Sequence, residues 1–284
     1  MLKKLIDTHV HIWDFEKADY DWLKNDESIL NRNYSIDEFD EARVEVGITE
    51  AVLVQAANNF EDTDHMLEVA GDKDWVSGVV GWLPLMNPGQ TLKALEDKYA
   101  RNPFFKGIRH LVHDEPDPQW LLQDEVIESL KILSSFNLPF DVVAVLPKHI
   151  ETAMEVANKV PGLKMVFDHI SQPPISTKEK FGLWGQLMEE AANMDNFYVK
   201  VSGLGNTSKN FYQWTAADIT PYIEFALEKF GSDRCFCGGN WPVSLLAESF
   251  TNTWEAYIKV ISSLLDESQQ EKVFYTNAQK FYHL

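Results

Sequence analysis

The chain has 284 residues, of which 45% are hydrophobic and 24% are charged, and this composition excludes a disordered, collagen-like or low-complexity protein. Its 25 Lys and Arg against 44 Asp and Glu give a net charge of −19, which disfavours nucleic acid and anionic membrane surfaces as partners. No apolar run reaches the roughly 18 residues of a membrane span, and Asp7 interrupts the N-terminal segment before a secretory signal could form.

Short apolar runs typical of strands recur eight times, and each is followed by a helical or loop-plus-helix stretch. They are rich in Val, Ile and Phe and lack clean alternation, as expected for strands buried on both faces. Their starts lie about 25–45 residues apart, the length of a βα unit. The pattern predicts an α/β protein, a (β/α)8 TIM barrel in one domain over 1–284, with a doubly wound sheet as the alternative. The runs are 5–10, 51–56, 76–82, 105–111, 138–145, 163–167, 197–201 and 234–237.

Helical segments between these runs carry recognisable end signals. Ser35 and Glu38 form the pattern of a capping box that opens the first helix. Thr220-Pro221 predicts the start of a later helix, and Gly231 its end. Amphipathic helices are also expected over 119–136, 177–194 and 250–265. The aromatic segment 12–34, with Trp13, Tyr20 and Trp22, is interpreted as a loop or lid over one end of the barrel.

The eighth run contains both cysteines of the chain, Cys235 and Cys237. Two residues apart in an extended strand, they are too far from each other to form a disulfide, and we expect a cytoplasmic protein.

Polar side chains follow nearly all eight strands at the point where each strand ends. Active sites of such barrels lie at the carboxyl ends of the strands. Polar groups there are hard to explain as core packing, because an unsatisfied buried polar group costs several kcal/mol. The candidates are His9, His11, Gln55, Trp82, Arg109, His110, Asp141, Asp168, His169, Lys200, Ser202, Asn240 and Trp241.

The pair His9 and His11 is the most distinctive of these features. Residues two apart in a strand project to the same side, so both imidazoles can face one ligand or metal ion. His169 can supply a third inward imidazole, with Asp168 orienting it or, alternatively, capping backbone amides in a turn. Asn240 follows two glycines, which allow close backbone approach, although a plain glycine-rich strand exit has the same pattern.

Taken together, these motifs resemble the amidohydrolase superfamily, and within it the amidohydrolase-2 group of L-fucono- and L-rhamnono-lactonases and 2-pyrone-4,6-dicarboxylate lactonases. The resemblance runs from residue 5 to residue 282 and implies a distorted barrel that hydrolyses a cyclic ester, often a sugar lactone. The matching segments are 6–13 (IDTHVHIW), 106–109 (KGIR), Asp168-His169 followed by Pro173, 239–242 (GNWP) and 277–282 (NAQKFY).

The chain departs from the family at Asn240, where the family has Asp. The resemblance assigns that Asp the role of general base toward water. An amide oxygen accepts hydrogen bonds but is an extremely poor proton acceptor, and loss of such a base costs about 10²–10⁴ in rate. A deliberate Asp-to-Asn replacement that impairs the enzyme and a natural, catalytically silent member both explain the residue, and we favour the replacement.

The resemblance also raises the question of a metal ion. Many members hold one or two divalent ions, but here the fourth strand ends in Arg109 and the fifth in Asp141, where those members place a bridging group and a His. Arginine stays protonated and cannot form a bridging carbamate, which disfavours a two-metal site. We favour no cofactor, with one zinc ion on His9, His11 and His169 as the alternative.

The mechanism that the resemblance implies places the lactone carbonyl oxygen toward His9, His11 and His169. Arg109 would stabilise the oxyanion, and residue 240, when acidic, would activate water. Further expected substrate contacts are Lys200 and Asp141, and Trp13, Trp82 and Trp241 as flat faces for a sugar ring. The alternative for the three tryptophans is that they pack within the protein.

Three functions stay open. The first is hydrolysis of a sugar-acid lactone in carbohydrate catabolism. Arg109 together with Lys200 would suit a dicarboxylate lactone, but we favour a neutral lactone as the substrate. The second is a metal-dependent decarboxylase on the same barrel, and the third a non-catalytic ligand-binding barrel. The expected partner is a small molecule, and a homo-oligomer is left open.

Overall fold

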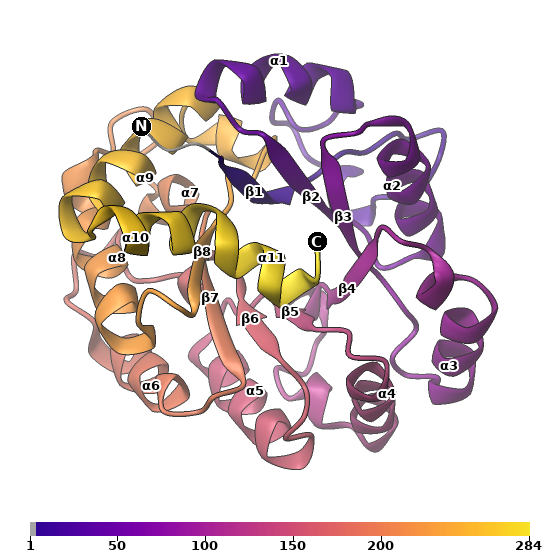
Figure 1. The fold of residues 1–284 in the computed structure, drawn as a ribbon. Helices are drawn as coiled ribbons and strands as arrows, with labels where there is room; N and C mark the ends of the chain where they lie inside the picture. The colour runs from indigo at the N-terminus through magenta and orange to yellow at the C-terminus, as the bar shows by residue number, and fades with distance from the viewer. Residues whose placement is uncertain (1–3) are drawn as a thin grey trace.

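The computed structural model describes residues 4–284, which form a barrel of eight parallel strands surrounded by helices (Figure 1). The strands are paired in sequence order from β1 to β8, which confirms the (β/α)8 prediction. A doubly wound sheet would reverse its strand order part-way, so that alternative is wrong. The strands are β1 Ile6–Val10, β2 Glu50–Val54, β3 Val76–Gly81, β4 Phe105–His110, β5 Phe140–Val142, β6 Met165–Phe167, β7 Phe197–Val201 and β8 Cys235–Cys237.

The barrel interior is filled by side chains of the strands. Val52, Val54, Val166 and Phe236 belong to one buried cluster there. Because the outer faces of the strands pack on helices as well, both faces are apolar, which explains the missing alternation. The last helix, α11 (Asn277–Tyr282), crosses the end of the barrel where the strands begin, and its tyrosine joins the interior cluster (Figure 1).

The helices lie outside the sheet, and their ends correct part of the sequence interpretation. The capping box at Ser35 and Glu38 opens α1 as predicted. The helix predicted to begin at Thr220-Pro221 begins earlier, because the Asp218 carboxylate accepts from both the N–H and the hydroxyl of Thr215 and caps that end. The α-helices are α1 Ile36–Val46, α2 Phe60–Asp72, α3 Pro88–Asp97, α4 Asp124–Ser135, α5 Pro147–Lys159, α6 Gly182–Ala192, α7 Leu204–Ser208, α8 Ala216–Phe230, α9 Phe250–Leu264, α10 Glu267–Glu271 and α11.

Two further helices, α4 and α6, begin five residues later than the predicted 119 and 177, after 3-10 or irregular turns. Within residues 4–284, no helix combines the length and apolar character needed to cross a membrane. Cys235 and Cys237 are buried free thiols, as the spacing predicted.

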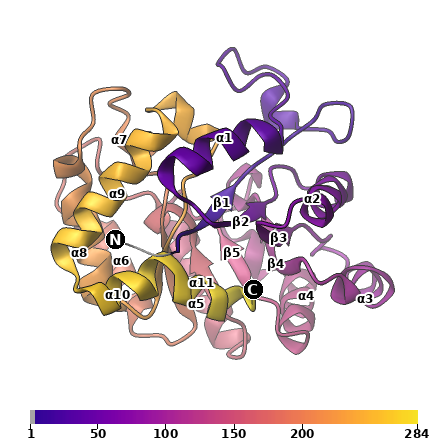
Figure 2. The same cartoon turned by 45° about the horizontal axis from the view of Figure 1, so that its top comes forward.

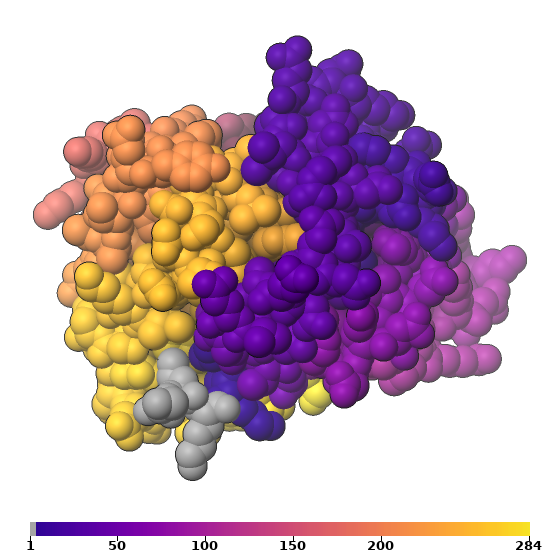
Figure 3. Space-filling model, turned by 90° about the horizontal axis from the view of Figure 1, so that it is seen from above, coloured from indigo at the N-terminus to yellow at the C-terminus, as the bar shows by residue number. Residues whose placement is uncertain are grey.

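The barrel closes between β8 and β1 through a short junction instead of a regular ladder. The Asn240 N–H donates to the His9 carbonyl at 2.8 Å, and the His11 N–H donates to the Trp241 carbonyl at 2.7 Å. Gly238 permits this approach, since a Cβ at that position would lie 2.6 Å from the Cβ of His9. Figure 3 shows the indigo N-terminal surface against the orange and yellow surface of the C-terminal segments.

Segment 12–34 forms the loop that the sequence predicted, with one 3-10 turn over Asp21–Leu23. Its two ends are tied by a pair of backbone hydrogen bonds between Trp13 and Tyr34, at 3.1 and 2.9 Å. Figure 2 shows the segment as the indigo loops that project at the upper right. Trp22 of this loop lines a cavity together with His11 and Arg109, so the segment covers the end where the strands finish.

Candidate active site

A cavity of about 240 Å³ lies at the carboxyl ends of the strands. Four of the five predicted catalytic side chains line it: His11 after β1, Arg109 on β4, His169 after β6 and Asn240 after β8. An apolar part of the remaining wall comes from Ala56, Leu111, Val143, Val145 and Val243. The barrel therefore brings a guanidinium, two imidazoles and an amide together in a partly dry site.

Arg109 is held by four of its five N–H groups. Its Nε donates to Gln55 Oε1 at 3.1 Å and its Nη2 to the Gln55 carbonyl at 2.5 Å. Its Nη1 donates to Asp168 Oδ2 and to His9 Nε2, both at 3.2 Å. One N–H on Nη2 is left for the cavity, so the guanidinium can give a substrate a single, fixed hydrogen bond.

Beneath the cavity lies a buried charge network centred on Lys200. Its ammonium group lies 2.5 Å from Asp141 Oδ2 and 3.2 Å from Asp168 Oδ1, and Tyr282 donates to Asp141 at 2.8 Å. Burial raises the pKa of Asp141 to about 6. Burial also acts to raise the pKa of Asp168, but the charges of Lys200 and Arg109 and the hydrogen bond from His9 hold that pKa well below its ordinary value.

The three predicted imidazoles have three different hydrogen-bonding states. His9 is fully buried beside the cavity: its Nε2 accepts from Arg109, and its Nδ1 lies 3.3 Å from Asp168 Oδ1. His11 Nδ1 lies 2.7 Å from the Val54 carbonyl, and His169 Nδ1 lies 2.8 Å from Ser202 Oγ. His9 therefore positions Arg109, while the other two rings keep Nε2 for the cavity.

His169 adopts a left-handed backbone conformation, with φ at 55°, in the turn that follows β6. This turn brings its ring against Gly203, where a Cβ would come within 2.7 Å of Nδ1. Gly203 is itself left-handed, with φ at 61°, so glycine serves both the turn and the close approach.

The model of the family described as Amidohydrolase matches residues 6–284 of the chain. The chain belongs to this amidohydrolase family. An L-fucono-1,5-lactonase of Burkholderia ambifaria is 30% identical in an alignment of 290 positions that covers 98% of this chain and 95% of that protein. An L-rhamnono-gamma-lactonase of Scheffersomyces stipitis is 27% identical in an alignment of 229 positions that covers 71% of this chain and 67% of that protein.

Among solved structures, an amidohydrolase of Burkholderia multivorans with bound zinc has the same fold. Its TM-score is 0.91 at 24% identity, and the match covers 99% of each chain. The resemblance deduced from the sequence motifs is thus confirmed at the level of family and barrel.

The aromatic side chain that lines the cavity of this amidohydrolase is Trp22. The predicted sugar platforms lie elsewhere. Trp13 and Trp241 are buried against Tyr34, and the half-buried Trp82 packs on Phe60 and donates to His110 Nδ1 at 3.0 Å. All three pack or make hydrogen bonds within the protein, and none lines the cavity.

Lys200 and Asp141 likewise form the floor beneath the cavity and do not line it. Several lining residues were not predicted. Four of them lie within five residues of a strand end, so a search that extended that far into each loop would have found them, whereas Trp22 belongs to segment 12–34, well beyond the end of β1. These unpredicted residues are Trp22, His113, Asp114, Gln172 and Asn206.

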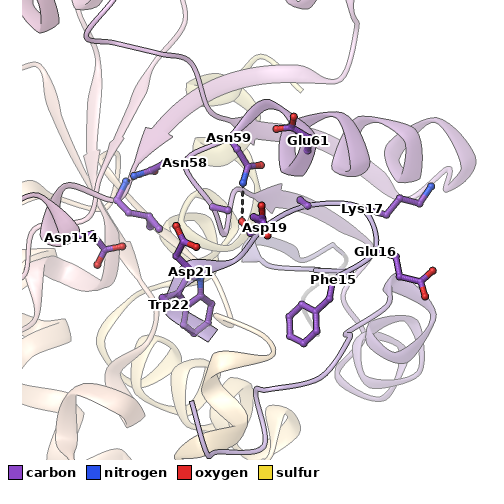
Figure 4. A pocket seen from close by; sticks show the side chains of 13 residues that line it. Phe15, Glu16, Lys17, Asp19, Asp21, Trp22, Asn58, Asn59, Glu61 and Asp114 are labelled. Carbon is purple, nitrogen blue, oxygen red and sulfur yellow. Dashed lines mark hydrogen bonds between the residues drawn. The ribbon is translucent and has the colours of Figure 1, made fainter. Parts of the chain in front are cut away.

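A second, larger cavity of about 840 Å³ adjoins the first, with Trp22, Leu111 and Asp114 lining both. Figure 4 shows this outer cavity between the lid segment and the start of α2. Five carboxylates and one lysine line it, namely Glu16, Asp19, Asp21, Glu61, Asp114 and Lys17. The approach to the site of this amidohydrolase is therefore strongly negative.

The residues present do not fit the single zinc ion that the sequence interpretation kept as an alternative. Both ring nitrogens of His9 face protein partners, and the lone pair that a metal ion would need accepts from Arg109. A cation there would meet a guanidinium in place of a third nitrogen ligand. Among residues 4–284, no three His, Cys, Asp or Glu side chains are grouped to hold a metal ion. We therefore derive no step through a metal.

The buried imidazoles predict a specific pH dependence of stability. Burial lowers the pKa of His169 from 6.5 to about 4, so between these pH values the unfolded chain binds the proton and the folded chain does not. The free energy of unfolding should therefore fall as the pH drops through this window, by about 2 kcal/mol from His169 alone at pH 5.

Urea titrations of the wild type and His169→Asn at pH 7.5 and pH 5 isolate this contribution, because asparagine tolerates the left-handed backbone but does not titrate. The difference in stability between the two proteins should shift by that amount in favour of the variant. A difference that stays constant with pH contradicts the prediction.

Proposed function

We propose that this amidohydrolase hydrolyses a neutral sugar lactone to the open-chain acid. The observation that carries the proposal is the single free N–H of Arg109, whose guanidinium is fixed by four other hydrogen bonds, beside two neutral imidazoles in one small cavity. The relatives named as sugar lactonases support the same reaction class. A donor fixed in advance and partly shielded from water suits an oxygen that gains negative charge.

In the proposed reaction, water attacks the lactone carbonyl carbon and the carbonyl oxygen becomes an oxyanion. Arg109 donates its remaining N–H to that oxygen, and its positive charge strengthens the bond in the water-poor site. His9 and Gln55 hold the guanidinium so that it does not reorganise during the reaction. The apolar walls and Trp22 enclose the ring of the substrate.

The charge of the site supports a neutral lactone over a dicarboxylate lactone. A second carboxylate would need a free cation, but Lys200 is fully buried against two aspartates and Arg109 has one N–H left. The acidic outer cavity would also repel a dianion on its way to the site. The positive charges of Arg109 and Lys200, which would have suited a dicarboxylate, are therefore not both available to bind the substrate.

The two other functions make different demands on the same cavity. A metal-dependent decarboxylase needs a tightly bound ion, and the imidazoles do not supply three free nitrogens for one. A binding barrel would need no proton acceptor near the carbonyl, and Asn240 is compatible with that function.

The proposal is tested by measuring proton release from a panel of aldonolactones with the protein of this sequence, which carries Asn240, and with Asn240→Asp. Asparagine and aspartate are nearly isosteric, so the variant should keep the fold, and the added carboxylate should raise kcat/KM about tenfold or more on at least one neutral lactone. Elemental analysis of both proteins accompanies the assay. Lactone hydrolysis that follows stoichiometric metal and is lost on chelation would contradict the metal-free site while keeping the reaction, and inactivity of both proteins across the panel would leave the decarboxylase and the binding barrel.

A further inference from the structure

We infer that His11 takes the proton from the attacking water in this chain, while His169 donates a hydrogen bond to the carbonyl oxygen of the substrate. The inference rests on the proposed lactone hydrolysis. It gives different roles to two imidazole rings that the sequence analysis treated alike. It also assigns a proton acceptor to a site whose residue 240 is an amide.

The tautomer of His11 follows from its partner. A backbone carbonyl can only accept, so the 2.7 Å contact with the Val54 carbonyl requires a proton on Nδ1 of His11. Burial and the neighbouring Arg109 charge hold the pKa of His11 well below 6.5, so the ring is neutral. Nε2 then carries a lone pair, and no hydrogen bond from residues 4–284 occupies it at the cavity wall. His11 is therefore a fixed proton acceptor.

The tautomer of His169 is the opposite one. Ser202 Oγ accepts from the backbone N–H of His169 at 3.2 Å and lies 2.8 Å from Nδ1 of the same residue. The buried hydroxyl makes no other hydrogen bond within the described chain, so its proton is satisfied only by donation to Nδ1. Nδ1 accepts, and the proton of the neutral ring is on Nε2. His169 therefore presents a donor to the cavity.

Asn240 completes the arrangement as a water-binding group. Its side chain lines the cavity and has no hydrogen-bond partner among the described residues, so its amide is free for a ligand. The amide oxygen can accept one hydrogen of the attacking water and orient it, but cannot take the proton. The other titratable groups on the cavity wall, His113 and Asp114, lie at its exposed rim.

The proton balance of the step is complete with these groups. The water oxygen bonds to the carbonyl carbon as its O–H proton passes to His11 Nε2, and the π electrons of the carbonyl move to the oxygen bound by Arg109 and His169. On collapse, the bond from that carbon to the ring oxygen breaks, and the ring oxygen takes the proton back from His11. The free acid then ionises and releases the proton that the assay detects.

The test is a double-mutant cycle of wild type, His11→Asn, Asn240→Asp and the double variant, on a lactone found in the panel. Asparagine can still donate to the Val54 carbonyl but lacks the Nε2 lone pair. His11→Asn should lower kcat about 10²-fold or more with KM nearly unchanged. In the Asn240→Asp background the same change should cost less than about tenfold, because the carboxylate then accepts the proton.

Ser202→Ala serves as the matched control for the donor, and its effect on kcat should be the same in both backgrounds. His65→Asn, whose ring lies outside the cavity, should leave the activity unchanged. Thermal unfolding checks each fold, and His11→Gln, which carries a polar group but no base, replaces His11→Asn if that variant does not fold.

Equal losses from His11→Asn in both backgrounds would overturn the inference, since His11 would then act in binding or packing. A wild type that is inactive on a lactone that Asn240→Asp hydrolyses would also overturn it while leaving the proposed function intact. If neither protein hydrolyses any lactone, the proposed function fails and the inference falls with it.

Discussion

Replacing Arg109 by methionine should lower kcat/KM for a neutral lactone by about 10³-fold. Removal of one oxyanion donor typically costs about 10²–10³ in kcat, and here the same side chain also holds His9 and neutralises Asp168. Because the bond to the oxygen strengthens only as charge develops, the loss should fall on kcat and not on KM. We would measure steady-state kinetics of proton release in the Asn240→Asp background, because its higher expected activity leaves room to detect a 10³-fold loss.

Arg109→Lys separates charge from geometry in the same assay. Lysine keeps the positive charge but cannot reach Gln55, His9 and Asp168 at once, so we expect most of the activity to be lost with less loss of stability. Arg101→Met, at an exposed position, controls for loss of an arginine as such. A loss below about tenfold in Arg109→Met, or one confined to KM, would contradict the assigned role.

Lys200→Met should destabilise the fold by about 3–5 kcal/mol. The change removes the ammonium group from between Asp141 and Asp168, which are both fully buried, and leaves two like charges with too few partners. Breaking a buried ion pair on one side costs this much because the remaining charge is uncompensated. Urea denaturation at pH 7.5 measures the difference in the free energy of unfolding.

The double variant Lys200→Met with Asp141→Asn should recover part of that loss, since it removes one of the two unpaired charges. Lys229→Met is the matched surface control: its partner Glu189 lies 2.8 Å away but is solvent-exposed, so the cost should stay below about 1 kcal/mol. If Lys200→Met costs no more than this control, the network does not stabilise the barrel.

Much of the fold could be predicted because the strands are buried on both faces. Predominantly apolar runs such as 51–56 and 197–201 identify such strands without any knowledge of the helices around them. Helix starts were less predictable. The proline at 221 indicated a start, but the Thr215 and Asp218 pair caps the helix more strongly one turn earlier.

The strand-end rule placed His11, Arg109, His169 and Asn240 correctly at one cavity, because parallel strands end at the same face. It did not distinguish side chains at the cavity wall from those one layer below, such as Lys200. That distinction depends on where each strand ends relative to its neighbours. The pairing register of the strands determines these relative positions, and no short stretch of sequence specifies that register.

The junction that closes the barrel between β8 and β1 links the active site to the local stability of the fold. Two backbone hydrogen bonds, together with those from the Gly239 N–H to Asp7 and from the Thr8 hydroxyl to the Cys237 carbonyl, tie the first strand to the exit of the last, whereas the other strand pairs share ladders. Transient opening of this junction would separate the side chain of Asn240 from that of His11 while the rest of the barrel stays assembled. Turnover would then be governed by the local stability of that junction more than by the free energy of unfolding of the whole molecule.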